Sequence, residues 1–423
     1  MNIALGRASR GLPARAIACV LALGLLAAAR PAAAQAPTPQ APAAQAPAAQ
    51  APAAQAPAAP DPAAAAPAMQ APAAPAPTVI RKKIRKVQYT ESEAPGGSTV
   101  QYQNRADVQA FIAEMAQKHG FVESELKFLF SRVRFYPSII DLITPPANPR
   151  VRSWQAYRSR FIEPIRIEGG VALWKRHAAT LARAEKEYGV PAEIIVAIIG
   201  VETVYGRNTG NFRVIDALST LAFDYPRRAE FFRSELENYL LFSREGDIDI
   251  FSLKGSYAGA IGIPQFMPSS WRQWAVDFDG DGKIDLRNNF TDAIGSVGNF
   301  LKGHGWVAGA PIAFPARLEG NNWRALQEQD ILPSAKLAEL PRLGVISESL
   351  MRQGLPDDTL CALIDLVTPD QPTEYVVGLQ NFYVITRYNR SSFYAMSVFE
   401  LGRAIKSARD AQAASPAPAV SRQ

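Results

Sequence analysis

The stretch that most constrains the fold is an apolar run that ends in one carboxylate. Residues 189–212, GVPAEIIVAIIGVETVYGRNTGNF, have apolar side chains at every position from 194 to 199, which is typical of a helix buried on all sides. Pro191 suits the first turn of that helix because its missing N–H would have no partner there. Glu202 lies at the end of the run, just before a polar loop. The pattern predicts a buried helix whose terminal carboxyl group borders a cleft and has a raised pKa.

A second interpretation of Glu202 is structural. Arg207 and Arg213 follow it closely in the sequence, and a glutamate at a helix end can form an ion pair with either of them. Structural ion pairs perturb pKa values as catalytic sites do, so the position of this residue does not by itself separate the two interpretations.

The first 34 residues have the pattern of a secretory signal peptide. Arginines precede an apolar run at 16–29, and small residues follow up to Ala34 in an A-x-A arrangement. The run is shorter than the ~20 residues that span a bilayer comfortably. Cys19 lies near the start of the run, whereas a lipidated cysteine would follow it directly, so we expect no lipid anchor.

Residues 35–100 have the composition of a spacer. The segment 35–78 repeats alanine, proline and glutamine, and its recurrent prolines favour extended conformations that form no core. Five of the positive charges behind the formal net charge of +6 lie in the run 81–86. Such a run is most often solvated, but it can also hold to anionic polymers. No nucleic-acid motif accompanies it, so we expect no nucleic-acid partner.

Residues 101–407 are predicted to form one mainly helical domain. Apolar residues recur at three- and four-residue spacing in several successive segments. Farther on, prolines separate shorter segments, and 375–384 is rich in β-branched and aromatic residues, as strands are. The elements that we expect toward the C-terminus are a small α/β insertion at about 313–380, a last helix at about 391–407 and a disordered tail at 408–423.

Three blocks of sequence resemble one enzyme family. They are VETVYGRNTGNF at 201–212, GAIGIPQFMPSSW at 259–271 and NFYVITRYNRSSFYAMSV at 381–398. Their order and spacing resemble those of the lytic murein transglycosylase B family of peptidoglycan-cleaving enzymes. The resemblance implies a mainly α, lysozyme-like catalytic core that acts on peptidoglycan glycan strands and requires no cofactor. We therefore expect a periplasmic monomer, with the basic run 81–86 available for association with the cell-wall surface.

The chemistry expected at Glu202 follows from a shortage of acids. Glycosidases normally use two carboxylates, and the three blocks hold one well-placed acid. Asp216 and Asp224 are possible seconds, but each lies beside an expected helix start, where N-capping explains an aspartate. The resemblance implies that one glutamate acts as acid and then as base, giving a 1,6-anhydro-muramic product without hydrolysis. A hydrolytic muramidase and a non-catalytic peptidoglycan-binding scaffold remain as alternatives.

The resemblance also implies a set of substrate-binding residues. Ring faces suit the C–H faces of sugars, hydroxyl and amide groups suit their polar edges, and guanidinium groups fit the carboxylates of the peptide stems. The matching positions are Tyr157, Arg227, Arg228, Ser256, Gln265, Tyr388, Asn389 and Tyr394.

The loop at 277–288, DFDGDGKIDLRN, follows the opening of a calcium-binding EF-hand loop. Asn288 stands where the usual bidentate glutamate would close the site, and in some family members a later aspartate, matched here by Asp292, closes it. The alternative is an Asx-turn loop whose acids cap local backbone. The ligand positions of the predicted weak, structural calcium site are Asp277, Asp279, Asp281, the Lys283 carbonyl and Asp292.

Overall fold

The computed structural model describes residues 102–144, 153–327 and 331–414. The expected signal peptide, the spacer and its basic run all lie outside these residues. The described part is mainly helical, with one sheet of two strands and one of five. None of its helices combines the length and the apolar character needed to cross a membrane.

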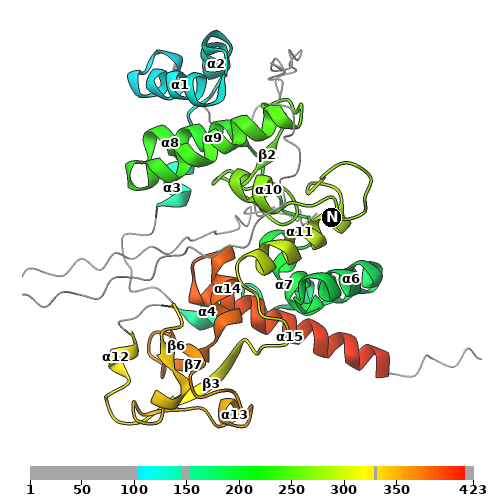
Figure 1. The fold of residues 1–423 in the computed structure, drawn as a ribbon, viewed down its shortest axis with the longest axis vertical. Helices are drawn as coiled ribbons and strands as arrows, with labels where there is room; N and C mark the ends of the chain where they lie inside the picture. The colour runs from blue at the N-terminus through cyan, green and yellow to red at the C-terminus, as the bar shows by residue number, and fades with distance from the viewer. Residues whose placement is uncertain (1–101, 145–152, 328–330, 415–423) are drawn as a thin grey trace, which may run out of the picture. The chain divides into compact units, whose positions relative to one another are not determined.

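The centre of the domain is helix α7 (Ala192–Thr203), whose residues 194–203 are all buried, as the apolar run predicts. Pro191 occupies the N-cap position, one residue earlier than the first turn expected for it. The last turn of α7 lies inside the core, where a carboxylate loses its hydration. The helices that pack against α7 are α5 (Pro164–Arg176), α6 (Ala178–Tyr188), α11 (Phe290–Gly303) and α15 (Ser392–Ala414) (Figure 1).

A second group of helices packs around α8 and α9, the two helices that follow α7 in the chain. Within it, α9 packs against both α8 and α10, α3 packs against α8, and α1 packs against α2. A 3-10 turn at Tyr102–Asn104 precedes α1, contacts both α1 and α2, and contributes the buried ring of Tyr102. The helices are α1 (Ala106–His119), α2 (Glu123–Phe130), α3 (Pro137–Ile143), α8 (Val214–Asp224), α9 (Ala229–Glu245) and α10 (Pro268–Trp274).

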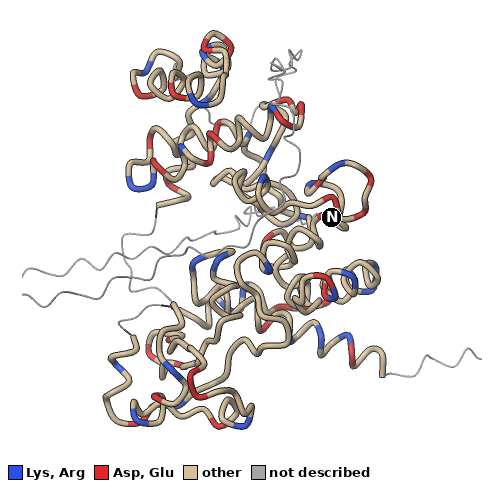
Figure 2. The backbone as a smooth tube through the Cα atoms, in the orientation of Figure 1, with Lys and Arg blue, Asp and Glu red and all other residues tan. Residues whose placement is uncertain are grey.

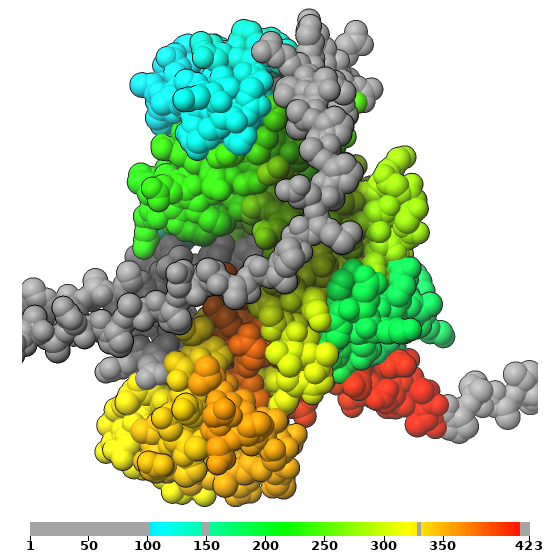
Figure 3. Space-filling model, viewed as in Figure 1, coloured from blue at the N-terminus to red at the C-terminus, as the bar shows by residue number. Residues whose placement is uncertain are grey.

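The insertion predicted at 313–380 contains an antiparallel sheet with the strand order β4-β6-β7-β3-β5. Cys361 and Leu363 of β6 belong to a hydrophobic cluster of the insertion itself, whereas Ala362 and Ile364 join the main core. Both faces of the strand are therefore buried, and the insertion forms the compact yellow-to-orange lobe of Figure 3. Its elements are β3 (Ala313–Leu318), α12 (Arg324–Gln327), β4 (Ala335–Lys336), β5 (Val345–Ile346), α13 (Glu348–Met351), β6 (Leu360–Leu366) and β7 (Glu374–Gly378).

The strand-like segment 375–384 was only partly predicted correctly. Strand β7 ends at Gly378, and helix α14 (Gln380–Tyr388) begins two residues later. Phe382 and Val384, which suggested a strand, are buried residues of that helix. A short buried apolar run fits either element, so its pattern could not locate the boundary.

The last helix is longer than predicted. Helix α15 extends to Ala414, so the prediction of a disordered tail is wrong for residues 408–414. Their sequence, ARDAQAA, is dominated by good helix formers and contains no proline. Residues 415–423 lie outside those described.

A two-stranded ribbon connects the loop after α7 to the glycine-rich loop at 256–267. Strand β1 (Phe212–Arg213) pairs with β2 (Lys254–Gly255). Gly210 has a φ of 95°, and a Cβ at this position would collide with the backbone of Gly255. Glycine is therefore required for the two chains to approach this closely.

Candidate active site

Glu202 lies in the last turn of α7 and is 4% exposed. The hydroxyl group of Tyr394, on α15, donates a hydrogen bond to Glu202 Oε1 at 2.6 Å. Burial raises the pKa of the Glu202 carboxyl group to about 7, although the hydrogen bond from Tyr394 acts in the opposite direction. A carboxyl group with this pKa can donate a proton and take one back near neutral pH, as general acid–base catalysis requires.

The ion-pair interpretation of Glu202 invoked Arg207 or Arg213. Arg213 pairs with Asp216, at 2.6 Å between Nε and Oδ2, and Arg207 is exposed on the loop after α7. The pKa of Glu202 is raised by burial. Arg213 is therefore engaged with another acid, and burial dominates the electrostatics of Glu202.

The backbone turns sharply directly after Glu202. Val204, Tyr205 and Gly206 have left-handed φ values of 50°, 59° and 80°, which is unusual for a β-branched residue such as valine. Thr203 Oγ1 donates to the Ile263 carbonyl at 2.9 Å and accepts from the Gly206 N–H at 2.9 Å. These bonds fasten the end of α7 to the glycine-rich loop.

Two of the predicted sugar-binding residues, Ser256 and Gln265, lie in the glycine-rich loop and are each 8% exposed. Ser256 Oγ accepts a hydrogen bond from the Ala260 N–H at 3.1 Å. Gln265 Nε2 donates to the carbonyls of Thr209 and Gly262 at 3.1 Å and 2.9 Å. Backbone groups of this loop and of the loop after α7 thus orient the two side chains, which leaves little side-chain ordering to occur when a ligand binds.

Aromatic residues of the third sequence block lie beside Glu202. The rings of Tyr388 and Tyr394 stack with planes 12° apart and centroids 6.4 Å apart. The Tyr388 hydroxyl donates to the carbonyl of Pro264, in the glycine-rich loop. Asn389 is buried, and within the described residues its Oδ1 has no hydrogen-bond partner. Tyr388 therefore extends the aromatic surface beside Tyr394, and Asn389, which directly follows α14, adds a buried amide acceptor.

Tyr157 reaches the same region from α4 (Trp154–Arg158). Its ring centroid lies 5.7 Å from that of Phe393, the residue before Tyr394, and 5.1 Å from that of Phe161. The structure thus brings together Tyr157, which precedes the first block by about forty-five positions, and residues near the C-terminus.

The predicted pair Arg227 and Arg228 occupies the 3-10 turn between α8 and α9. Arg227 is exposed. The Arg228 guanidinium lies 4.2 Å from the centre of the Phe231 ring, and burial lowers its pKa. Aromatic stacking holds this guanidinium in place, and its role toward a peptide stem stays a prediction.

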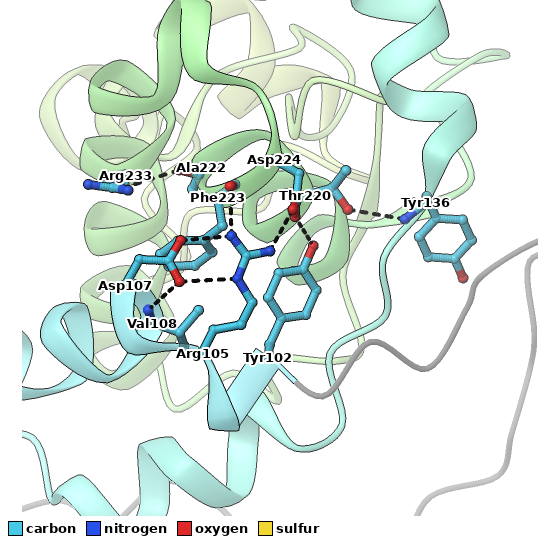
Figure 4. A network of polar contacts seen from close by, with 10 residues as sticks. All are labelled: Tyr102, Arg105, Asp107, Val108, Tyr136, Thr220, Ala222, Phe223, Asp224 and Arg233. Carbon is cyan, nitrogen blue, oxygen red and sulfur yellow. Dashed lines mark hydrogen bonds and ion pairs between the residues drawn. The ribbon is translucent and has the colours of Figure 1, made fainter.

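The two candidate second acids have structural partners. Asp216 is fully buried in the first turn of α8, where it pairs with Arg213. Asp224 accepts a hydrogen bond from the Tyr102 hydroxyl at 2.6 Å and forms an ion pair with Arg105 (Figure 4). The N-capping explanation was wrong for both, because Arg213 is the N-cap of α8 and Asp224 is its last residue. A local ion pair with Arg213 accounts for Asp216, and an ion pair with the distant Arg105 accounts for Asp224.

Acidic residues recur along the loop between α10 and α11, where Figure 2 marks them in red on the backbone. Oxygen atoms of Asp277, Asp279 and Asp292 lie within 4.8 Å of one another. Asp292 belongs to the first turn of α11, so the later aspartate does meet the start of the loop. Asp281 lies outside this group and accepts a hydrogen bond from the Lys283 N–H at 2.8 Å.

The same carboxylates organise the backbone of the loop. Asp277 accepts hydrogen bonds from the N–H groups of Gly280 and Gly282, each at 2.8 Å. Asp292 accepts the N–H of Phe278 at 2.8 Å. This is the pattern expected of the Asx-turn alternative. It is compatible with ion binding, since a carboxylate has about four lone-pair positions.

One buried acid was not identified from the sequence. Glu235 of α9 is 4% exposed, like Glu202, and burial raises its pKa. It accepts hydrogen bonds from the N–H and the hydroxyl of Ser269, at 3.0 Å and 2.6 Å. It therefore caps the first turn of α10 from a different helix, a role that no local pattern reveals.

Comparison with known proteins agrees with this geometry. The family described as transglycosylase SLT domain matches residues 103–403. Membrane-bound lytic murein transglycosylase B of Escherichia coli is 43% identical over 322 residues, which cover 73% of this chain and 85% of that protein. Soluble lytic transglycosylase SltB1 of Pseudomonas aeruginosa is 51% identical, with a TM-score of 0.66, over 72% of this chain and 99% of that chain. Escherichia coli lytic transglycosylase Slt35 in complex with calcium is 42% identical, with a TM-score of 0.63, over 73% and 95%.

The helical fold, the buried carboxyl group and these similarities define the class of protein as a lysozyme-like transglycosylase. The chain belongs to the lytic murein transglycosylase family of peptidoglycan-cleaving enzymes. The resemblance carried by the three sequence blocks is thereby confirmed, and so is the prediction of an enzyme. Membership of this enzyme family argues against the alternative of a non-catalytic peptidoglycan-binding scaffold.

Proposed function

We propose that this enzyme cleaves the β-1,4 bond between N-acetylmuramic acid and N-acetylglucosamine and leaves a 1,6-anhydro-muramic end, with Glu202 as acid and then as base. The observation that carries the proposal is the buried carboxyl group of Glu202, with a pKa of about 7 and a tyrosine hydroxyl 2.6 Å away. Such a group is protonated often enough to act as an acid and ionised often enough to act as a base.

The proposed sequence restores the protonation state of Glu202 and moves one proton, in net terms, from the muramic C6 hydroxyl to the leaving oxygen. Protonated Glu202 gives its proton to the glycosidic oxygen, and the bond from that oxygen to the muramic C1 breaks. The carboxylate then takes the proton of the muramic C6 hydroxyl while O6 bonds to C1. Glu202 ends protonated, as it began, and no water is consumed. An attacking hydroxyl within the same sugar has a high effective concentration, so no second carboxylate is needed to activate it.

We propose that the substrate-binding residues act from three sides of Glu202. Tyr157, Tyr388 and Tyr394 would pack against sugar rings, and Ser256, Gln265 and Asn389 would bond their polar groups. Support comes from the preset orientation of the loop side chains and from the buried, unsatisfied Oδ1 of Asn389. The pair Arg227–Arg228 would bind acidic groups of the peptide stem.

The proposed chemistry predicts that digestion creates almost no new reducing ends. An anhydro ring closes C1 onto O6, whereas hydrolysis frees one reducing end at each cut. Purified sacculi should be digested by this enzyme and, in parallel, by a hydrolytic muramidase, and the reducing ends should be counted per mass of soluble glycan. Equal counts for the two enzymes would support the muramidase alternative.

The proposal also predicts a pH profile. Since the protonated form of Glu202 starts the reaction, kcat/KM should fall about tenfold per pH unit above about 7. The hydrogen bond from Tyr394 lowers the pKa of Glu202, so Tyr394→Phe should move this descending limb to higher pH. Initial rates from pH 5 to 9 measure both effects. A limb that is absent, or that moves to lower pH in the variant, contradicts the assignment.

We propose that the acidic loop binds calcium as a structural ion, held by Asp277, Asp279 and Asp292. Support comes from the clustering of their oxygen atoms and from hard oxygen donors being the ligands that calcium prefers. When bound, the ion would offset two of the three negative charges and tie the start of α11 to the loop. Asp281 and the Lys283 carbonyl would complete the site only after a local rearrangement, because Asp281 lies outside the cluster.

Calcium binding predicts a rise in the melting temperature. An ion that binds only the folded state stabilises it by mass action, by about 2.7 kcal/mol at a concentration 100 times Kd. Thermal unfolding should be followed with millimolar calcium and with chelator, for the parent and for Asp279→Asn. The exposed Asp358 offers a matched control as Asp358→Asn. A rise that persists in Asp279→Asn, or its absence in the parent, favours the Asx-turn interpretation.

We propose a periplasmic location for the enzyme. The support is the signal-peptide pattern of residues 1–34 together with a substrate class, peptidoglycan, that lies outside the cytoplasm. The position of Cys19 argues against a lipid anchor, and mass spectrometry of the processed N-terminus would test both points.

A further inference from the structure

Three glycines surround the ring of Tyr205, the third residue after Glu202. A Cβ on Gly169 or Gly170 of α5 would lie 2.6 Å from the Tyr205 side chain, and one on Gly200 of α7 would lie 2.5 Å from its hydroxyl. Side chains at these positions would displace the ring. We call Gly169, Gly170 and Gly200 the glycine slot. Glycine destabilises a helix interior relative to alanine, and here the missing side chains make room for the Tyr205 ring.

Hydrogen bonds hold Tyr205 in the glycine slot. Its hydroxyl donates to the Arg166 carbonyl at 2.6 Å. The Arg166 guanidinium in turn donates from Nε to the Gly200 carbonyl at 3.1 Å and from Nη1 to the Arg160 carbonyl at 2.7 Å. The Gly200 carbonyl also accepts the Val204 N–H at 3.2 Å, so the guanidinium adds a second hydrogen bond to it and complements the helix dipole. Arg166, on α5, is therefore hydrogen-bonded both to Gly200 of α7 and to the Tyr205 hydroxyl.

The chain reaches the glycine slot through a costly backbone conformation. Val204 and Tyr205 are consecutive non-glycine residues with positive φ, and such residues persist only when their surroundings fix them. The ring of Tyr205 provides that constraint on one side. On the other side, Thr203 bonds to the Ile263 carbonyl. Glu202 precedes this strained turn, so movement of the turn would move its carboxyl group.

We propose that Tyr205 is a positioning residue for the reaction: its ring, held in the glycine slot, fixes the last turn of α7 so that the Glu202 carboxyl group stays enclosed beside the Tyr394 hydroxyl. The proposal rests on the acid–base role assigned to Glu202. Arg166 also donates to the Arg160 carbonyl, in the segment between α4 and α5. Phe161 of this segment contacts the Tyr157 ring. Tyr205 does not touch the substrate in this account.

Loss of this constraint has two expected consequences. Water would reach the Glu202 carboxyl group, and its pKa would fall toward the value of an exposed glutamate because burial is what raises it. The carboxyl group would also lose its alignment with the reacting atoms, and misplacement by about 1 Å can cost 10²-fold in rate. The residues proposed to bind sugar lie on other elements, so the loss should appear in kcat and leave KM nearly unchanged.

The test compares Tyr205→Leu with Tyr205→Phe. The leucine variant should lower kcat by about 30-fold or more with little change in KM, and the descending limb of its pH profile should move to lower pH. Phenylalanine keeps the ring in the slot and should restore most of kcat and the parent limb. Gly169→Ala provides a second test, to be used if Tyr205→Leu does not fold. Its added methyl group displaces the ring without altering Tyr205, so it should lower kcat and move the limb as Tyr205→Leu does.

A control separates positioning from general stability. Tyr239 of α9 is fully buried, whereas Tyr205 is partly buried, and the Tyr239 hydroxyl likewise donates to a backbone carbonyl, that of Ile250, at 2.7 Å. Tyr239→Leu should lower the melting temperature but keep the parent kcat and pH limb per folded molecule. If the Tyr205 and Tyr239 variants lose kcat in proportion to stability, with unmoved limbs, Tyr205 is merely structural and the proposal is overturned.

An activity-independent measurement keeps this proposal distinct from the proposed function. The pH dependence of unfolding, compared with and without Glu202→Gln, reports the Glu202 pKa in the folded protein. That pKa should be lower in a Tyr205→Leu background than in the parent. An equal pKa in the two backgrounds refutes the positioning role even if Glu202 is catalytic. A shifted pKa combined with an active Glu202→Gln enzyme would instead refute the acid–base assignment alone.

Discussion

Replacing Glu202 by glutamine is expected to lower turnover on peptidoglycan by about 10²- to 10⁴-fold, the range that a general acid–base group contributes. Glutamine has nearly the same size and can accept the hydrogen bond from Tyr394. It cannot give a proton to the glycosidic oxygen or take one from the C6 hydroxyl. The fold and the binding of glycan should persist, so release of soluble fragments from purified sacculi is the quantity that should fall.

Glu235→Gln is the matched control for this experiment. Both glutamates are 4% exposed, both have raised pKa values, and both accept a hydroxyl hydrogen bond at 2.6 Å. Glu235 caps α10, so its replacement should reduce stability and leave turnover per folded molecule close to that of the parent. Turnover of the Glu202 variant above about one per cent of the parent rate would be incompatible with a single acid–base glutamate.

The same Glu202→Gln variant should be more stable than the parent in alkaline solution, by up to about 3 kcal/mol. Burial raises the pKa from 4.5 in the unfolded chain to about 7 in the folded one. Between these values the unfolded chain has lost a proton that the folded protein still holds, so this group lowers stability as the pH rises from 4.5 to 7 and adds no further loss above that. Glutamine does not ionise and avoids this loss.

Urea unfolding of the two proteins across the pH range measures this effect. At pH 4 the carboxyl group is mostly protonated in both states, so the stability difference there reflects the change of side chain alone. The difference should then grow up to about pH 7 and remain constant above it. A difference that is independent of pH would mean that Glu202 ionises in the folded protein as it does in an exposed peptide.

The sequence predicted the central helix and its carboxylate because both depend on local patterns. An unbroken apolar run must be buried, and an acid at its end must be desolvated, whatever surrounds them. The acidic loop was equally readable, since its aspartates and glycines have fixed spacing. The predicted reaction came from the family resemblance, which is carried by three blocks far apart in the chain. That reaction requires one glutamate, and the three blocks contain one well-placed acid, Glu202.

The features that the sequence did not predict depend on contacts between distant segments. Glu235 caps a helix that begins more than thirty positions later in the chain. Asp224 forms an ion pair with Arg105, which lies 119 positions earlier. The role of Tyr205 also requires three glycines on two helices. The boundary at Gly378 was missed for a different reason, because short buried runs do not distinguish strands from helices.

Reaction in oxygen-18 water tests the central claim most directly. If the muramic C6 hydroxyl attacks C1, the attacking oxygen comes from the sugar, and solvent water must be kept from the reacting carbon. Mass spectrometry should then find an unlabelled anhydro-muramyl product, one water lighter than the product of hydrolysis. Reducing-end muramic acid that carries the heavy oxygen as the main product would contradict the account. The enzyme would then be a muramidase, and Asp216 and Asp224 would again be candidates for a second acid.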